Sequence, residues 1–431
     1  MHCLHHRALF AATIMLTAGC GVTAESVSSG EDTDLQSNND ATSEVTSDIR
    51  AGEDVGPAID AEAPELTRGQ AIRLKYDGLF EEVETFLHDP ELCVDGHWQL
   101  HYGDGQMYGP SFDLKQWRVT GEEVHRDRAL EVLEVNRQSV VAATEDLLGA
   151  MDDLETIAMS LLSLVECGLY LDDATAYREA ADGLIEPLDE LALGLGDYLS
   201  IDAGEFAATT YGPTALTAFL ALLHFEYVIA YPDHNASHHI ARGEAVLEAV
   251  YNTAWDAEMA TFAFAPGNTK RYLYPSITMM LAYARGYALT GDPLHLARFW
   301  QAYEGIQPLK DPAGDHYYSP YSADSMGATD EDYTTLSSQN YLMLALLAAY
   351  EATGDEALLD EVDLNLGFIA DNLVSEGRIL HHWMNGMMAQ PEDPYDYCLG
   401  CNAQSLYILL LVGDATYTVP PEHDEGAPDV R

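Results

Sequence analysis

Lysine is scarce in this chain of 431 residues. Only Lys75, Lys115, Lys270 and Lys310 occur, and 19 Lys and Arg face 72 Asp and Glu, so the net charge is −53. A surface this acidic repels nucleic acid and anionic lipid, which argues against both as partners. The acidic residues lack the spacing of a calcium-binding loop, so adaptation to high salt is favoured over a cation-binding surface.

Motifs for common cofactors are also missing. The sequence has no Walker loop, no G-x-G-x-x-G fingerprint, no G-x-S-x-G elbow and no H-E-x-x-H pair. Their absence argues against phosphate transfer, nicotinamide chemistry and zincin proteolysis. We therefore expect neither a cofactor nor a bound metal. No apolar stretch reaches the length of about 20 residues that a membrane-spanning helix needs.

The chain begins like an exported protein. Arg7 precedes the apolar run Ala8–Leu16, and Cys20 follows the small residues Thr17, Ala18 and Gly19, as at the end of a signal peptide. This end resembles a bacterial lipobox. The resemblance implies that residues 1–19 are removed and that lipidated Cys20 is the only membrane contact. It also implies a place in the bacterial cell envelope, for which we expect the outer membrane, facing the periplasm or the outside.

Composition divides the rest of the chain. Residues 20–66 are rich in Ser, Thr, Asp, Glu and Gly and nearly free of aromatics, so they cannot bury enough apolar surface to offset the entropy of ordering. We predict a disordered acidic tether there. Residues 67–418 are predicted to form one domain, because one repeat runs through them, and residues 419–431 a flexible acidic tail.

A short polar mark recurs six times along this domain. Its closing acids are Glu122, Asp173, Asp233, Asp292, Asp355 and Asp414, separated by 51, 60, 59, 63 and 59 positions. A period near 60 is too long for the common solenoid repeats but suits a pair of helices with a loop. Most marks follow an apolar segment and precede an amphipathic one, so six helical hairpins are predicted.

The two kinds of segment predict two layers. Segments before the marks, such as 341–352, are apolar nearly all round and should form inner helices. Segments after the marks, such as 356–373, have apolar residues at steps of three and four and should form outer helices. The first helix, 66–87, lacks an inner partner and the last, 406–412, lacks an outer one. Packing these ends together would close a ring and remove the need for capping repeats.

This pattern resembles the (α/α)6 toroids of the six-hairpin glycosidase-like superfamily, which includes N-acylglucosamine 2-epimerase-like proteins. The resemblance rests on the stretch from Leu344 to Asp355 and on Trp255-Asp256-Ala257-Glu258 after an outer helix. It implies an all-α toroid over about residues 67–415. Because the catalytic positions of that family cannot be matched to this chain, no activity is carried over with the fold.

The predicted loops place a site on one face of the ring. The marks are short inner-to-outer turns, whereas most outer-to-inner connections are long, so the long loops emerge together at the N-termini of the inner helices. These loops carry aromatic residues, which stack on sugar rings, and carboxyl and amide groups, which bind hydroxyls or move protons. The predicted substrate-binding residues are Trp98, Tyr211, Tyr272, Tyr274, Tyr318, Tyr321, Gln339, Asn340, Trp383 and Asn402.

Four residues in these loops are candidate catalytic groups. Asp332 stands close to the entry of an inner helix and Asp396 lies among tyrosines, although such acids more often solvate or cap. His381 and His382 could exchange protons near neutral pH. If residues 379–384 form one strand, the two histidines face opposite ways and only one reaches the cavity.

Four cysteines remain beyond Cys20 and the leader: Cys93, Cys167, Cys398 and Cys401. The C-x-x-C formed by Cys398 and Cys401 favours a local disulfide. A redox pair lacks its usual βαβ context, and zinc binding with one or both nearby histidines lacks a common spacing.

These features favour a carbohydrate-active protein, a glycoside hydrolase or a sugar epimerase, with a carbohydrate as its ligand. Paired acids across the mouth would suit hydrolysis and a pair of histidines would suit epimerisation. The alternative is a non-catalytic surface lipoprotein that uses the toroid to bind glycans or proteins.

Overall fold

The computed structural model describes residues 66–89, 92–94, 96–98, 104–146, 154–194, 212–264, 273–319, 333–384, 387–388 and 398–421. Pro64–Arg431 form one compact unit. The leader, Cys20, the tether and the end of the acidic tail lie outside the described residues. Among the helices that are described, none is long and apolar enough to cross a membrane.

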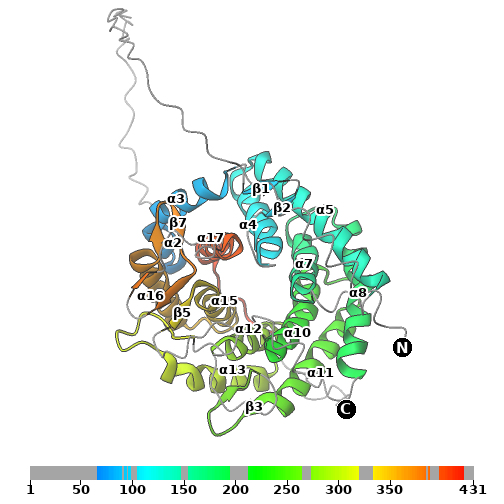
Figure 1. The fold of residues 1–431 in the computed structure, drawn as a ribbon. Helices are drawn as coiled ribbons and strands as arrows, with labels where there is room; N and C mark the ends of the chain where they lie inside the picture. Colours follow the sequence, from blue (N-terminus) through cyan, green and yellow to red (C-terminus); the bar gives the residue numbers. More distant parts are fainter. Residues whose placement is uncertain are drawn as a thin grey trace, which may run out of the picture. The chain divides into compact units, whose positions relative to one another are not determined.

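Six helices form the inner layer of the described part (Figure 1). They are α4 (Asp104–Thr120), α7 (Leu154–Glu166), α10 (Gly212–Ala230), α12 (Leu273–Thr290), α15 (Leu336–Thr353) and α17 (Leu399–Asp414). Each contacts the next in chain order, and α17 returns to contact α4. In α15 every residue from Leu336 to Ala349 is buried, which confirms the apolar-all-round prediction. The inner helices therefore form a closed ring.

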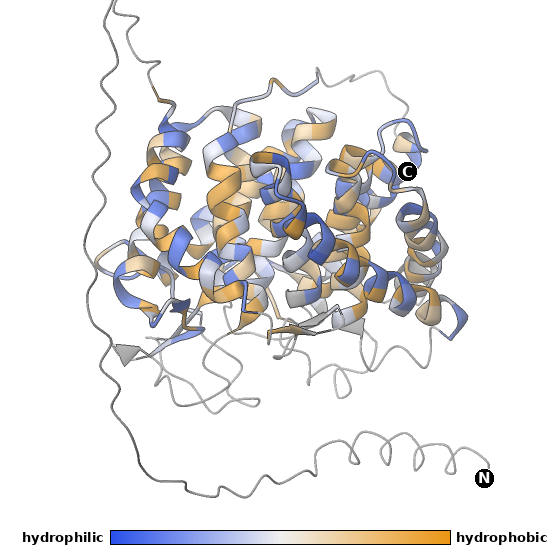
Figure 2. Ribbon diagram, turned by 90° about the horizontal axis from the view of Figure 1, so that it is seen from above, coloured by the Kyte–Doolittle hydropathy of each residue, from blue (hydrophilic) through white to orange (hydrophobic). Residues whose placement is uncertain are grey.

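The outer helices cover this ring. They are α2 (Arg68–Lys75), α3 (Asp77–Leu87), α5 (Glu123–Glu145), α8 (Thr175–Gly194), α11 (Ala236–Ala254), α13 (Pro293–Ile306) and α16 (Glu356–Asn372). In α16 the buried residues include Leu358, Leu359, Val362, Leu366 and Ile369, at the expected steps of three and four. Figure 2 shows the helices of the unit side by side, with hydrophobic stretches along them.

The predicted closure between the two ends of the repeat is confirmed, because α2 and α3 pack against α17. The structure corrects one detail. The first outer segment is two helices, because Tyr76, with φ −107° and ψ 21°, ends α2 and begins α3. The Tyr76 hydroxyl donates to the backbone oxygen of Asp363 at 2.9 Å and thereby joins this break to α16.

The repeated marks are tight turns with helix caps at some positions. Gly291 and Gly354 have φ of 67° and 72°, a left-handed conformation that glycine adopts without steric cost. Asp292 and Asp355 then accept the amide hydrogens of Leu294 and Ala357 at 2.8 and 3.1 Å. Glu122 stands at the equivalent N-cap of α5 without a side-chain cap hydrogen bond, so the marks share a turn but not one capping chemistry.

Short antiparallel strand pairs lie in the outer-to-inner connections. β1 (Cys93–Val94) pairs with β2 (His97–Trp98), β3 (Trp255–Asp256) with β4 (Thr261–Phe262), and β6 (Val374–Ser375) with β7 (Arg378–Ile379). A three-stranded sheet has β8 (His382–Met384) between β5 (Tyr333–Thr335) and β9 (Met387–Met388). Because β5 leads directly into α15, this sheet lies at the N-terminal end of an inner helix.

Candidate functional site

A cavity of about 100 Å³ lies inside the ring. All six inner helices contribute to its lining, which includes Tyr108, Glu166, Glu226, Arg285, Leu344 and Tyr407. Most of these residues stand in the C-terminal halves of their helices. The cavity is therefore nearer the face of the short turns than the face of the long loops.

Arg285 joins two carboxylates beside this cavity. Its Nε donates to Glu226 Oε1 at 2.8 Å and its Nη1 donates to Glu351 Oε2 at 3.0 Å. The Glu226 side chain is 7% exposed, so its charge depends on the guanidinium for compensation. The three residues connect α10, α12 and α15 across the interior of the ring.

Glu166 is a second buried acid of the cavity. Ser111 Oγ donates to its Oε2 at 2.6 Å. Burial and, to a lesser extent, the negative charge of Glu226 raise the pKa of Glu166 to about 8, although the hydrogen bond from Ser111 and the charge of Arg285 oppose the shift. Glu166 is thus predominantly protonated near neutral pH and can act as a proton donor.

Aromatic side chains fill the ring on the N-terminal side of this cavity. The ring of Tyr341 lies 5.9 Å from that of Tyr108, 5.5 Å from that of Phe219 and 5.2 Å from that of Tyr274. Along α15, Tyr341 precedes the cavity-lining Leu344 by one helical turn. Tyr341 and its aromatic neighbours therefore lie between Leu344 and the N-terminal end of α15.

The two candidate histidines meet on that face. The backbone N–H of Leu336, the first residue of α15, donates to the His381 carbonyl oxygen at 2.8 Å. His381 Nδ1 and His382 Nε2 are 2.9 Å apart and form a hydrogen bond whose direction depends on the tautomers. Tyr333 stacks on His382 with the ring centres 5.6 Å apart. Both histidines are partly exposed.

This arrangement corrects the expectation that the histidines face opposite ways. Residues 379–384 are not one strand, because β7 ends at Ile379 and β8 begins at His382. The break at Leu380 and His381 removes the alternation that separates neighbours in a strand. Burial and the neighbouring His382 hold the pKa of His381 well below its usual value, so its imidazole is uncharged at physiological pH.

The structure does not describe the side chains of several predicted site residues. Asp332, Asp396, Tyr211, Tyr272 and Tyr321 lie outside the described residues, and of Trp98 only the backbone, in β2, is described.

Three predicted amides have a different role. Gln339 accepts from the Tyr317 N–H at 3.1 Å and donates to the Tyr317 carbonyl at 2.8 Å. Asn340 donates to the Cys401 carbonyl at 2.9 Å. Asn402 accepts from the Ile379 N–H and donates to its carbonyl, both at 2.8 Å. These fully buried amides hold connections to the inner helices, which corrects their assignment to substrate binding.

The predicted aromatic residues that are described lie near the mouth and are partly exposed. Tyr274 packs on Tyr341, the Tyr318 hydroxyl donates to Asp311, and the ring of Trp383 meets the edge of Phe368 at 5.8 Å. Their assignment to substrate binding stays a prediction.

The predicted disulfide between Cys398 and Cys401 is absent. No sulfur–sulfur bond joins the two residues, and both side chains are buried. Cys398 Sγ instead accepts the backbone N–H of Cys401 at 3.1 Å and caps the N-terminus of α17. The Cys398 sulfur is therefore the N-cap acceptor, a position that Ser or Asp occupies in many other helices.

Sequence reasoning missed Glu166, Glu226 and Arg285. The signal was present, because Glu226 and Arg285 interrupt helices that are otherwise almost entirely apolar. A charged residue in such a helix requires a partner inside the protein.

No protein-family model and no curated protein matches the chain. Among solved structures, a D-mannose isomerase matches 80% of this chain and 99% of its own, with 12% identity and a TM-score of 0.56. Cellobiose 2-epimerase from Bacillus thermoamylovorans matches 79% of this chain and 99% of its own, with 13% identity and a TM-score of 0.54. The α-1,6-mannanase of Salegentibacter matches 79% of this chain and 100% of its own, with 12% identity and a TM-score of 0.56.

The fold is an (α/α)6 toroid. This confirms the fold class that the repeat predicts. Identities this low show the fold alone and leave the chemistry to be argued from the residues of this toroid.

Proposed function

We propose that the protein is a carbohydrate-active enzyme that transfers a proton at a sugar carbon, as a sugar epimerase or isomerase does, at the long-loop mouth of the toroid. The observation that carries this proposal is the hydrogen-bonded pair His381–His382 at the N-terminal end of α15. Two of the similar structures, the D-mannose isomerase and the cellobiose 2-epimerase, act on sugars by name.

The pair suits removal of the proton on the carbon next to a sugar carbonyl. A neutral imidazole nitrogen takes this proton, and the electron pair of the C–H bond forms the enediolate. Return of the proton to the other face of the same carbon gives the epimer, and return to the former carbonyl carbon gives the ketose. The hydrogen bond between the rings holds the base in place and lets its partner share the positive charge.

The test is turnover of simple sugars by the purified full chain. Mannose, glucose, cellobiose and mannobiose are incubated with the wild type and the products are separated by chromatography. We expect His381→Asn and His382→Asn to lower the rate by about 100-fold or more, because the proton acceptor is lost or misplaced. His238→Asn is the matched control, since His238 is exposed on α11. An unchanged rate of sugar turnover in His381→Asn would contradict the proposal.

Glycoside hydrolysis is the second candidate, and it is favoured by Glu166 and Glu226, the two acids that line the cavity inside the ring. Protonated Glu166 could donate to a leaving oxygen while Glu226 acts as base or nucleophile. The size of the cavity ranks this candidate second. Its volume of about 100 Å³ is smaller than the roughly 150 Å³ of an engineered protein cavity that binds benzene, so a sugar ring would have to displace the lining.

Hydrolysis is tested by release of reducing ends from α-1,6-linked mannan oligosaccharides. The Salegentibacter mannanase structure is of a variant inactivated by replacement of two adjacent aspartates, with α-1,6-mannotriose bound. This chain also has adjacent aspartates. Asp152 and Asp153 directly precede α7 in sequence and are the pair to replace, and Asp172 and Asp173 serve as the control pair.

The four outcomes of this assay separate the candidates. Loss of hydrolysis in Glu166→Gln or Glu226→Gln would assign it to the cavity. Loss only on replacing Asp152 and Asp153 by Asn, and not on replacing Asp172 and Asp173, would assign it to that aspartate pair. No reducing ends from any glycan with the wild type would exclude hydrolysis. Saturable glycan binding without any turnover would favour the non-catalytic alternative.

We further propose that the chain is anchored in the bacterial cell envelope through lipidated Cys20. The sequence supports this by its apolar leader and lipobox-like end. Labelling with radioactive palmitate should mark the wild type in the membrane fraction, and Cys20→Ser should be unlabelled. Equal labelling of both would contradict the anchor.

A further inference from the structure

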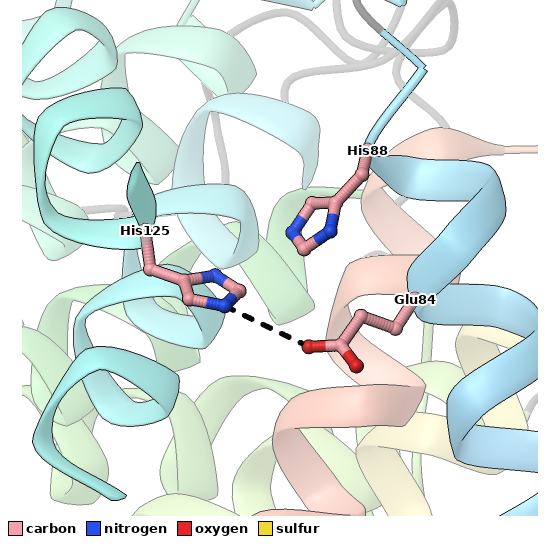
Figure 3. Close-up of side chains that lie close together, drawn as sticks. All are labelled: Glu84, His88 and His125. Carbon is pink, nitrogen blue, oxygen red and sulfur yellow. Dashed lines mark ion pairs between the residues drawn. The ribbon is translucent and has the colours of Figure 1, made fainter. Parts of the chain in front are cut away.

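Three side chains capable of binding a metal converge between two outer helices. Glu84 lies on α3, His88 directly follows that helix, and His125 lies in the first turn of α5. One ligand atom from each of them lies within 4.8 Å of the other two. Figure 3 shows the two imidazoles and the carboxylate directed toward a common point.

His125 is held in one orientation by a buried carboxylate. Its Nδ1 lies 3.2 Å from Asp113 Oδ1, and Asp113 is fully buried. Asp113 is fixed in turn by Arg128, whose Nε and Nη2 each donate to one of its oxygens at 2.6 Å. A neutral His125 therefore donates from Nδ1 and keeps the lone pair of Nε2 free. This is how metal-binding histidines are usually oriented.

That lone pair points at another acceptor. His125 Nε2 lies 3.8 Å from Glu84 Oε1, as drawn in Figure 3. Glu84 Oε1 also accepts from Gln116 Nε2 at 2.8 Å, which fixes the carboxylate from the side of α4. An imidazole lone pair facing a carboxylate oxygen is repulsive unless a proton or a metal ion lies between them.

The surrounding charges favour a cation. Asp113, Glu84 and Glu122, whose Oε2 is 3.9 Å from His125 Nε2, carry three negative charges, and Arg128 carries one positive charge. With neutral imidazoles these charged groups have a net charge of −2, which a divalent ion would neutralise.

We propose that Glu84, His88 and His125 bind one divalent transition-metal ion, with Zn²⁺ as the best fit. Two imidazole nitrogens and one carboxylate oxygen are ligands that Zn²⁺ accepts, and three protein ligands leave a fourth position for water. The ion would connect α3 to α5. These segments are already joined by a hydrogen bond that Arg128 Nη1 donates to the Leu87 carbonyl oxygen at 2.8 Å. Its role would be to fasten the first outer helix to the next one around the ring. This inference is independent of the proposed function.

The test measures metal binding by the full chain after treatment with a chelator. Zn²⁺ is titrated into wild type, His88→Gln and Glu84→Gln by calorimetry, and the melting temperature is measured with and without Zn²⁺. His88 is exposed, so its replacement should not prevent folding. We expect the wild type to bind one more equivalent than either variant, or to bind that equivalent at least about ten-fold more tightly. Zn²⁺ should also raise the melting temperature of the wild type more than that of either variant.

Two controls separate this site from other ligands in the chain. His238→Gln should behave like the wild type, and metal held by the histidines of residues 1–65 or by the Asp311, Asp315 and His316 cluster cancels in the comparison with His88→Gln. Co²⁺ at the proposed site should give visible d–d bands without a sulfur-to-metal charge-transfer band. Identical stoichiometry, affinity and melting shift in wild type, His88→Gln and Glu84→Gln would overturn the proposal and identify the cluster as a proton-bridged ion pair.

Discussion

Glu166 shows at the residue scale what burial does to one carboxyl group. Its pKa rises from 4.5 to about 8 in the folded protein. The folded state therefore binds this proton more tightly than the unfolded chain, so the contribution to stability is greatest below about pH 4.5 and decreases as the pH rises towards about 8. Glu166→Gln removes this titration and can still accept from Ser111.

We expect the free energy of unfolding of the wild type to fall, relative to that of Glu166→Gln, between about pH 5 and pH 8, by up to a few kcal/mol. Urea unfolding at both pH values measures the difference. Parallel pH profiles for the two proteins would contradict the raised pKa.

Residue type alone shows which side chains can hydrogen-bond or titrate, but not what they contact in the fold. The residue type of His381 and His382 predicts proton exchange near neutral pH, and the structure brings the two rings into contact. The residue type of Gln339 and Asn402 predicts binding of hydroxyl groups, but both side chains are hydrogen-bonded to backbone groups from elsewhere in the chain. The sequence shows a donor or acceptor, whereas its partner depends on how distant segments pack.

At the scale of elements, the caps of α13 and α16 test the meaning of the repeated mark. Asp292→Ala and Asp355→Ala each remove a side-chain acceptor for a first-turn N–H, and we expect each to lower the free energy of unfolding by about 1 kcal/mol. Asp→Asn at the same positions keeps the acceptor and should cost much less. Equal losses for Ala and Asn, measured by urea unfolding, would show that the caps are not the cause.

At the scale of the whole molecule, closure of the ring depends on how closely α2 approaches α17. A Cβ added at Gly69 would lie 2.1 Å from the carbonyl oxygen of Val412. We expect Gly69→Ala to lower the melting temperature, because one of the two helices must move.

Gly78→Ala is the matched control, since an added Cβ there meets nothing within 4 Å. Replacing a helical glycine by alanine in open space should be neutral or should stabilise by up to about 1 kcal/mol. If thermal melting showed no difference between the two variants, the tight seam between the chain ends would be refuted.

Most of this architecture could be predicted from the sequence, because spacing near 60 and the contrast between apolar and amphipathic segments are local properties. The two-layer ring and its closure both follow from them. The sequence marks Glu226 and Arg285 as charges within apolar helices, but it does not show that they meet Glu166 at one cavity, because the three belong to three different inner helices. The same holds for the cluster of Glu84, His88 and His125, whose members meet only when α3 lies beside α5.

The central claim is that His381 and His382 form the proton-transfer site of a sugar-converting enzyme. Incubation with aldoses in deuterium oxide tests it most directly, with nuclear magnetic resonance reporting deuterium at the carbon next to the carbonyl. The account predicts incorporation by the wild type with at least one sugar and its loss in His381→Asn, while His238→Asn retains it. Incorporation at equal rates in wild type and His381→Asn, or none with any aldose tested, would contradict it.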